Sequence, residues 1–158
     1  MKVAFNTLGC KLNQYETTVM EEQFEEKGYD IVSFEDKADL YVINTCTVTG
    51  KTDCHSRQAI RRAVKTNKSA FIIVTGCYAQ TNPQDIKKIA GVDLILGNTE
   101  KGRMFKYING LDNREEPLIK VSNASEEKEF LHTKIKKFFK RTRAFVKIQD
   151  GCDSTCCY

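Results

Sequence analysis

The chain has 158 residues, of which 41% are hydrophobic and 29% charged, and its formal net charge is +4. This composition is typical of a globular protein with one domain and a sizeable core. It contains no apolar run near the ~20 residues of a membrane helix, and its first residues lack the pattern of a signal peptide. We therefore expect a cytoplasmic protein without a membrane partner, whose seven cysteines are ligands or reactive thiols rather than disulfides.

Strands and helices are predicted to alternate along the first two thirds of the chain. In order, we expect a strand over Lys2–Leu8, a helix over about Asn13–Lys27, strands over Tyr29–Phe34 and Leu40–Thr45, a helix over about Gly50–Thr66, a strand over Phe71–Thr75, a helix capped by Asn82 with Pro83 first, a strand over Val92–Leu96 and a helix over Glu100–Ile108. This alternation predicts an α/β fold with right-handed crossovers. Five strands suggest a flavodoxin-like parallel five-stranded sheet, in the order 2-1-3-4-5, with helices on both faces.

Three of the predicted strands end at a cysteine. The first, third and fourth lead into Cys10, Cys46 and Cys77, and the predicted order makes these strands neighbours. The three thiols would then emerge at one carboxyl edge, beside the switch point where such folds bind ligands. Cysteine thiolates hold iron–sulfur clusters without any other ligand type. Three of them on a four-iron cluster would leave one iron open to an exogenous sulfur or a substrate.

Other interpretations of these cysteines exist. A single cysteine at a strand end is usually a small buried hydrophobic residue, but three at matching exits favour a metal or cluster site. Zinc with His55 as a further ligand is an alternative, although His55 is expected on the solvated face of a helix. Cys54, in the same predicted helix, is expected to take no part.

The remaining chain has a different character. We expect a domain over residues 1–110, a polar linker over 111–142, and the start of a second, truncated domain at 143–158, with a strand at Ala144–Gln149. Between His132 and Gln149 there is no acidic residue, and the basic residues are Lys134, Lys136, Lys137, Lys140, Arg141, Arg143 and Lys147. This basic run suits phosphate contacts with RNA or a solvated linker.

Five motifs then occur in a fixed order: LGCKLNQYE, INTCTVTGKTDCHSRQAIRR, VTGCYAQ, DLILGNTEK and RAFVKIQDGCDSTCCY. In these motifs the chain resembles the methylthiotransferases, which are radical S-adenosylmethionine enzymes, over nearly all of their N-terminal domain. The resemblance implies that Cys10, Cys46 and Cys77 hold an auxiliary 4Fe–4S cluster. The last motif resembles the start of the radical motif C-x3-C-x2-C, with Cys152 and Cys156 as two ligands of a second 4Fe–4S cluster. The third ligand would fall just beyond Tyr158, and Cys157 has the wrong spacing to replace it.

The resemblance also implies a reaction. The second cluster would bind S-adenosylmethionine and generate a radical in a barrel domain, because a carbon–hydrogen bond without an acidic proton cannot be opened by a general base. Sulfur from the auxiliary cluster, carrying a methyl group, would then replace the hydrogen. An electron donor such as a flavodoxin is implied. Without the barrel and the third ligand, we expect the chain by itself to be inactive.

The first motif, TLGCKLNQYE, is most similar to the branch that acts on N6-threonylcarbamoyladenosine at position 37 of tRNA. In it, Asn13 and Gln14 would shape the cluster pocket or cap the helix. The branches that act on isopentenyladenosine-37 of tRNA or on a ribosomal protein remain alternatives. Outside the family, the alternatives are a flavin-binding module and a non-catalytic RNA-binding protein with structural zinc.

Overall fold

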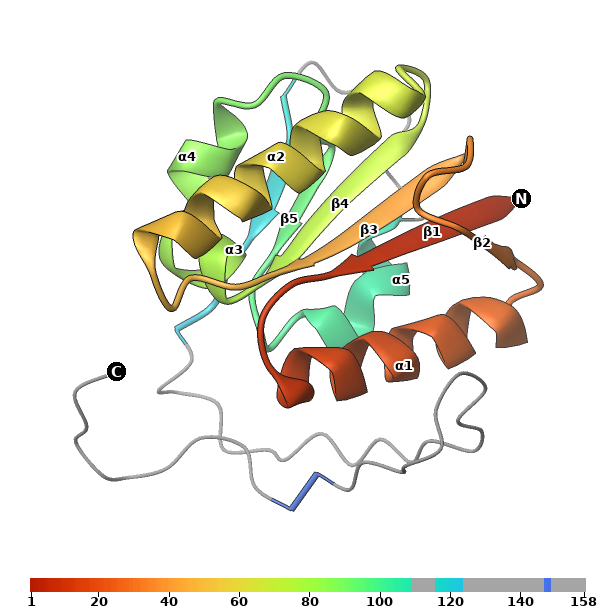
Figure 1. The fold of residues 1–158 in the computed structure, drawn as a ribbon. Coiled ribbons are helices and arrows are strands. Elements are labelled where there is room, and N and C mark those ends of the chain that lie inside the picture. The colour runs from red at the N-terminus through yellow and green to blue at the C-terminus, as the bar shows by residue number, and fades with distance from the viewer. Residues whose placement is uncertain (109–115, 124–146, 149–158) are drawn as a thin grey trace.

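The computed structural model describes residues 1–108, 116–123 and 147–148. A parallel sheet in the order β2-β1-β3-β4-β5-β6 lies between two layers of helices (Figure 1). The strands are β1 (Lys2–Thr7), β2 (Asp30–Val32), β3 (Leu40–Thr45), β4 (Phe71–Gly76), β5 (Leu94–Leu96) and β6 (Leu118–Lys120). The helices are α1 (Lys11–Glu26), α2 (Gly50–Thr66), α3 (Cys77–Thr81), α4 (Pro83–Lys87), the 3-10 turn η1 (Lys101–Arg103) and α5 (Met104–Ile108).

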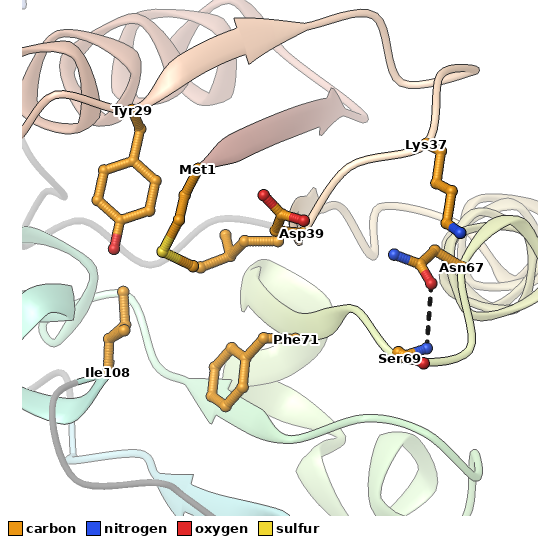
Figure 2. Close-up of a pocket in the computed structure, with 9 residues that line it drawn as sticks. Met1, Tyr29, Lys37, Asp39, Asn67, Ser69, Phe71 and Ile108 are labelled. Carbon is orange, nitrogen blue, oxygen red and sulfur yellow. Dashed lines mark hydrogen bonds between the residues drawn. The ribbon is translucent and has the colours of Figure 1, made fainter.

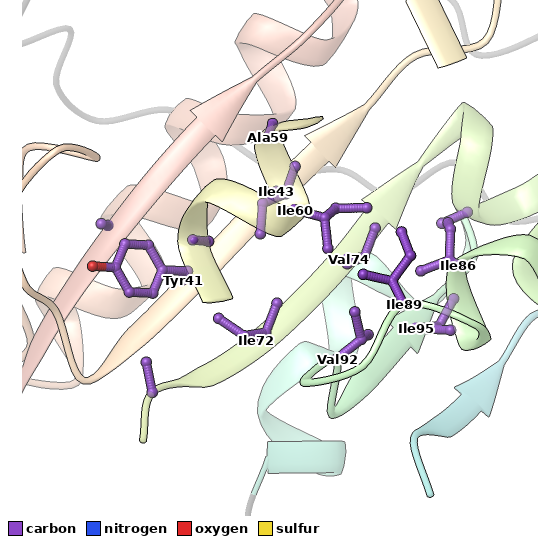
Figure 3. Close-up of a cluster of buried hydrophobic side chains, with 14 of the residues drawn as sticks. Tyr41, Ile43, Ala59, Ile60, Ile72, Val74, Ile86, Ile89, Val92 and Ile95 are labelled. Atoms are coloured by element: carbon purple, nitrogen blue, oxygen red, sulfur yellow. The ribbon is translucent and has the colours of Figure 1, made fainter. Parts of the chain in front are cut away.

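The sheet is buried on both faces because its central strands are continuously apolar. All six residues of β3 are buried, and alternate side chains serve opposite layers. Tyr41 and Ile43 pack with Ile60 of α2 in one cluster (Figure 3), which also takes in side chains of α3 and α4. Leu40 and Val42 pack in the other cluster, with side chains from α1 and α5. Helices α2 to α4 therefore cover one face, and α1 and α5 the other (Figure 1).

The predicted strand order 2-1-3-4-5 is confirmed, and every pair of neighbouring strands is parallel. The sequence predicted five strands, whereas the described residues form a sheet of six. β6 pairs with β5, with Leu94 opposite Leu118, and it falls in the range 111–142 that the sequence suggested as a linker. Its three residues are too few to give an alternating pattern.

One predicted helix start and one predicted helix cap need correction. Helix α1 begins at Lys11, two residues earlier than expected, with Cys10 at its N-cap position. Asn82 does precede a helix with Pro83 at its start, but its side chain does not cap that helix. The Asn82 amide donates instead to the Thr81 hydroxyl at 2.9 Å, while its backbone carbonyl accepts from Asp85 and Ile86.

In the described ranges, no helix combines the length and apolar character needed to cross a bilayer. Most of the predicted C-terminal features lie outside these ranges, including Cys152, Cys156, Cys157 and the basic run before Lys147. Of the predicted strand Ala144–Gln149, only Lys147 and Ile148 are described, and neither is in a strand.

Candidate metal centre

Strands β1, β3 and β4 end level with one another at the carboxyl edge of the sheet. Thr7 pairs with Asn44, and Thr45 pairs with Gly76. The Leu8 amide extends the first ladder by donating to the Asn44 carbonyl oxygen at 2.9 Å. The backbone therefore brings the three strand exits that carry Cys10, Cys46 and Cys77 to one edge, as their spacing predicted.

Gly9 brings the first exit against the second. Its φ is +98°, in the left-handed region that side chains rarely adopt. A Cβ at this position would lie 2.5 Å from the Cys46 Cβ and 2.7 Å from the Cys46 Sγ. Only a glycine allows this approach, so the residue before Cys10 lies directly against the side chain of Cys46.

Gly76 allows the same close approach between the second and third strand exits. Its φ is +96°, and a Cβ would lie 2.3 Å from the Thr45 carbonyl oxygen and 2.7 Å from the Thr45 amide nitrogen. These are backbone atoms that cannot move aside without breaking the ladder. The chain turns there, and Cys77 becomes the first residue of α3.

Asn13 joins the exits through its side chain, which is 2% exposed. Its amide donates to the carbonyl oxygens of Leu8 at 2.8 Å and Thr45 at 3.0 Å, and its Oδ1 accepts from the Cys10 Sγ at 3.7 Å. No side chain caps α1. Asn13 therefore connects the residues that flank two of the cysteines.

The cysteines differ in exposure. Cys10 is exposed, Cys46 is buried and Cys77 lies between these extremes, and none of the three forms a disulfide. Such a gradient gives the edge a closed inner side at Cys46 and an open outer side at Cys10. Soft thiolate donors at such an edge are chemically suited to an iron–sulfur cluster.

The thiols also influence one another. Burial raises the pKa of the Cys77 thiol, the Lys101 ammonium lowers it, and Cys46, Glu16 and Cys10 each raise it further. Burial is the largest of these causes, so the neutral thiol is favoured at Cys77.

The further residue considered for zinc, His55, lies on α2. Within the described residues, no three His, Cys, Asp or Glu side chains are grouped to hold a metal ion. His55 and Cys54 are exposed on α2, and Cys54 accepts from the Gln58 amide at 3.7 Å.

A pocket of about 690 Å³ lies at the opposite, amino edge of the sheet (Figure 2). Its apolar side chains include Met1, Phe71 and Ile108, and the Ser69 amide donates to the Asn67 side chain on its polar side. Doubly wound folds bind their ligands at the carboxyl edge, so this pocket is separate from the cysteine group.

Sequence reasoning missed a buried ion pair between two of the quoted motifs. Glu16 and Lys101 form an ion pair at 2.6 Å. They are the last residues of the motifs LGCKLNQYE and DLILGNTEK. Their place in these two motifs is the one feature of the sequence that could have drawn attention to them.

The fold and this edge define a class: a doubly wound parallel α/β domain with three free cysteines at neighbouring strand exits. A family model described as "Uncharacterized protein family UPF0004" matches residues 2–97. The chain belongs to this family.

Curated relatives extend the similarity to the whole chain. The chain is 46% identical to threonylcarbamoyladenosine tRNA methylthiotransferase MtaB of Aquifex aeolicus, over 100% of this chain and 38% of the relative. It is also 46% identical to the protein of the same name from Bacillus subtilis, over 99% of this chain and 35% of the relative. A tRNA-2-methylthio-N(6)-dimethylallyladenosine synthase of Fusobacterium nucleatum is 29% identical, over 99% of this chain and 36% of the relative. These similarities confirm the resemblance to methylthiotransferases, and the chain spans little more than a third of these relatives.

Proposed function

We propose that this chain is the cluster-binding part of a tRNA methylthiotransferase that modifies C2 of N6-threonylcarbamoyladenosine at position 37. One observation carries the proposal: three free cysteines stand at the exits of the adjacent strands β1, β3 and β4. In the proposal, Cys10, Cys46 and Cys77 hold the auxiliary 4Fe–4S cluster. Cys152 and Cys156, outside the described residues, would provide ligands of the second cluster.

The names of the relatives support this substrate. Both relatives at 46% identity are named for threonylcarbamoyladenosine, whereas the relative at 29% is named for dimethylallyladenosine. The proposal therefore takes tRNA as the substrate and threonylcarbamoyladenosine as the modified base. An electron donor such as a flavodoxin belongs to the same proposal.

The described residues have definite tasks in this proposal. When bound, the clusters and S-adenosylmethionine supply the radical and sulfur chemistry. Cys46 provides an anchor shielded from water, and Cys10 provides a ligand at the open side. Asn13 fixes the exits of β1 and β3 relative to each other, and Gly9 and Gly76 allow the backbones to approach.

The cluster assignment is tested by anaerobic reconstitution, iron and sulfide analysis, and a visible spectrum. A Cys152→Ala/Cys156→Ala variant isolates the strand-edge site and is expected to retain about four irons per chain. Adding Cys10→Ala, Cys46→Ala and Cys77→Ala is expected to remove them, whereas adding Cys54→Ala as a matched control is not. Unchanged iron after loss of the three edge cysteines would refute the assignment. A yellow flavin spectrum or a colourless zinc protein would favour an alternative class.

The substrate is tested separately, with tRNA nucleosides measured by mass spectrometry in cells that carry the intact gene or its Cys46→Ala form. The variant is expected to lose the 2-methylthio group from threonylcarbamoyladenosine and to keep it on isopentenyladenosine. Loss from isopentenyladenosine alone would assign the chain to the other tRNA branch.

A further inference from the structure

The Thr45 side chain is a buried polar group between the second and third strand exits. Thr45 ends β3 directly before Cys46, and it is 0% exposed. A hydroxyl group shut off from water costs free energy unless it is hydrogen-bonded. The partners of this hydroxyl group therefore indicate what the residue does at the cysteine edge.

The Thr45 hydroxyl group binds the chain on both sides of Cys77. It donates to the Thr75 carbonyl oxygen at 2.5 Å, and it accepts from the Ala79 amide at 3.3 Å. Thr75 lies two residues before Cys77, and Ala79 lies two residues after it. One side chain of β3 thus brackets the turn from β4 into α3, in which Cys77 is the first helical residue.

The turn at Cys77 has no capping side chain of its own. An N-cap side chain ordinarily accepts from the amide of the second or third helical residue, but the N-cap of α3 is Gly76. A Cβ there would lie 2.3 Å from the Thr45 carbonyl oxygen, so a residue with a capping side chain does not fit. Ala79 is the third residue of α3, and the hydroxyl group from the neighbouring strand replaces the missing cap.

The support that carries this hydroxyl group is itself held in place. The Thr45 carbonyl oxygen accepts from the Asn13 amide at 3.0 Å. On the side of α2, the buried Ser56 hydroxyl group donates to the Cys46 carbonyl oxygen at 3.0 Å. The segment Thr45–Cys46 is therefore fixed from both sides, and it gives the turn at Cys77 a rigid partner.

We propose that Thr45 is a positioning residue for Cys77, whose hydroxyl group holds the turn of the third cysteine against the exit of the second. The proposal rests on the proposed cluster, because a bound group needs its ligands held in a fixed geometry by the residues around them. Thr45 is not a ligand. It acts through the backbone of Thr75 and Ala79 on either side of Cys77.

The test compares Thr45→Val, which keeps the shape and removes the hydroxyl group, with Thr45→Ser, which keeps the hydroxyl group. Each change is made in the Cys152→Ala/Cys156→Ala protein, and the release of iron to a chelator is followed after reconstitution. Thr45→Val is expected to release iron about tenfold faster than the parent, because buried hydrogen bonds at the turn are lost. Thr45→Ser is expected to restore the parent rate.

Tyr41→Phe is the matched control. Tyr41 is a buried residue near the other end of β3. Its hydroxyl group makes the same two kinds of hydrogen bond, donating to the Asp36 carbonyl oxygen at 2.6 Å and accepting from the Ala38 amide at 3.1 Å. This variant is expected to lose stability in urea and to keep the parent rate of iron release. Equally fast release in Tyr41→Phe and Thr45→Val would mean that Thr45 acts on the fold alone, and would overturn the inference.

A second measurement does not depend on the cluster. In the metal-free protein, alkylation by iodoacetamide is followed at each cysteine by mass spectrometry. Thr45→Val is expected to raise the rate at Cys77 about tenfold relative to the exposed Cys10, because the turn opens more readily. A parent rate at Cys77 in this variant would overturn the inference and leave the proposed cluster standing. Absence of iron in the parent protein would instead overturn the proposed function, and the alkylation rates would still decide whether Thr45 holds Cys77.

Discussion

The side-chain amide of Asn13 donates a 3.0 Å hydrogen bond to the backbone carbonyl oxygen of Thr45, the residue before Cys46. The same amide donates at 2.8 Å to the carbonyl oxygen of Leu8. One buried side chain thus fixes the exits of β1 and β3, on which two of the three cysteines depend. The geometry of the edge is therefore set by a residue that need not be a ligand.

Replacement of this donor should affect both stability and cluster binding. Asn13→Asp keeps the shape but removes both N–H donors, so that the two carbonyl oxygens lose their partner. We expect the free energy of unfolding to fall by roughly 1–3 kcal/mol in urea denaturation, and iron content after reconstitution to fall with it.

Asn67→Asp is the matched control. The Asn67 amide also donates to a carbonyl oxygen, that of Ala38 at 2.7 Å, but it lies at the amino edge beside the pocket of Figure 2. This variant should lose stability and keep its iron. Equal loss of iron in both variants would mean that Asn13 acts on the fold alone.

The close approach of Gly9 to Cys46 gives a second prediction. In Gly9→Ala, a methyl group would meet the Cys46 side chain at 2.5 Å. We expect a loss in unfolding free energy above the roughly 1–3 kcal/mol that a strained backbone conformation costs by itself, together with a loss of iron.

Gly28 provides the comparison for this change. Its φ is +79°, also left-handed, but a Cβ there would meet nothing within 4 Å. Gly28→Ala should therefore lower the free energy of unfolding only by the cost of the left-handed backbone conformation, about 1–2 kcal/mol. Its iron content should be unchanged. The prediction fails if the two alanine variants are equally stable and bind equal iron.

The sequence was sufficient for the centre of the fold and insufficient at its margins. β3 and β4 are continuous apolar runs, and such runs indicate buried parallel strands; their positions also predicted the edge where the cysteines meet. β6 has three residues and no periodicity, and only its pairing with β5 in space identifies it. The Glu16–Lys101 contact joins charged residues far apart in the chain, whose usual place is solvent, so no spacing rule could pair them.

The attachment of β6 leads to a third prediction. Gln80 of α3 accepts from the Asn98 amide at 2.8 Å and donates to the Ser122 carbonyl oxygen at 2.9 Å, which fastens the exits of β5 and β6 together. In Gln80→Ala, we expect faster hydrogen exchange at the amides of Gly97 and Leu118, whose partners are Lys120 and Asp93, because local opening becomes easier. Exchange in β3 should not change. Unaltered protection of both amides would show that Gln80 does not hold β6.

The carboxylate of Asp93 gives a pH-dependent prediction. Its Oδ2 accepts from the Ile72 amide at 2.7 Å. Burial raises the pKa of Asp93, and the hydrogen bond from Ile72 lowers it by less. A carboxyl group whose pKa is higher in the folded state than in the unfolded state holds its proton more tightly when folded. Its contribution to stability therefore falls as pH rises from the unfolded-state pKa to the folded-state pKa.

Asp93→Asn keeps an acceptor for Ile72 and cannot ionise. The unfolding free energies of the variant and the wild type are measured in urea on cluster-free protein. We expect the variant to become more stable relative to the wild type as pH increases from about 4, the ordinary pKa of aspartate, toward neutral pH. Asp85→Asn is a control of opposite sign, because the hydrogen bond and charge of Lys88 lower the pKa of Asp85. This variant should lose stability relative to the wild type as pH rises toward about 4, and should not change relative to it above that pH. The loss should be small, since the pair is exposed. A constant difference between Asp93→Asn and the wild type across the series would exclude the raised pKa.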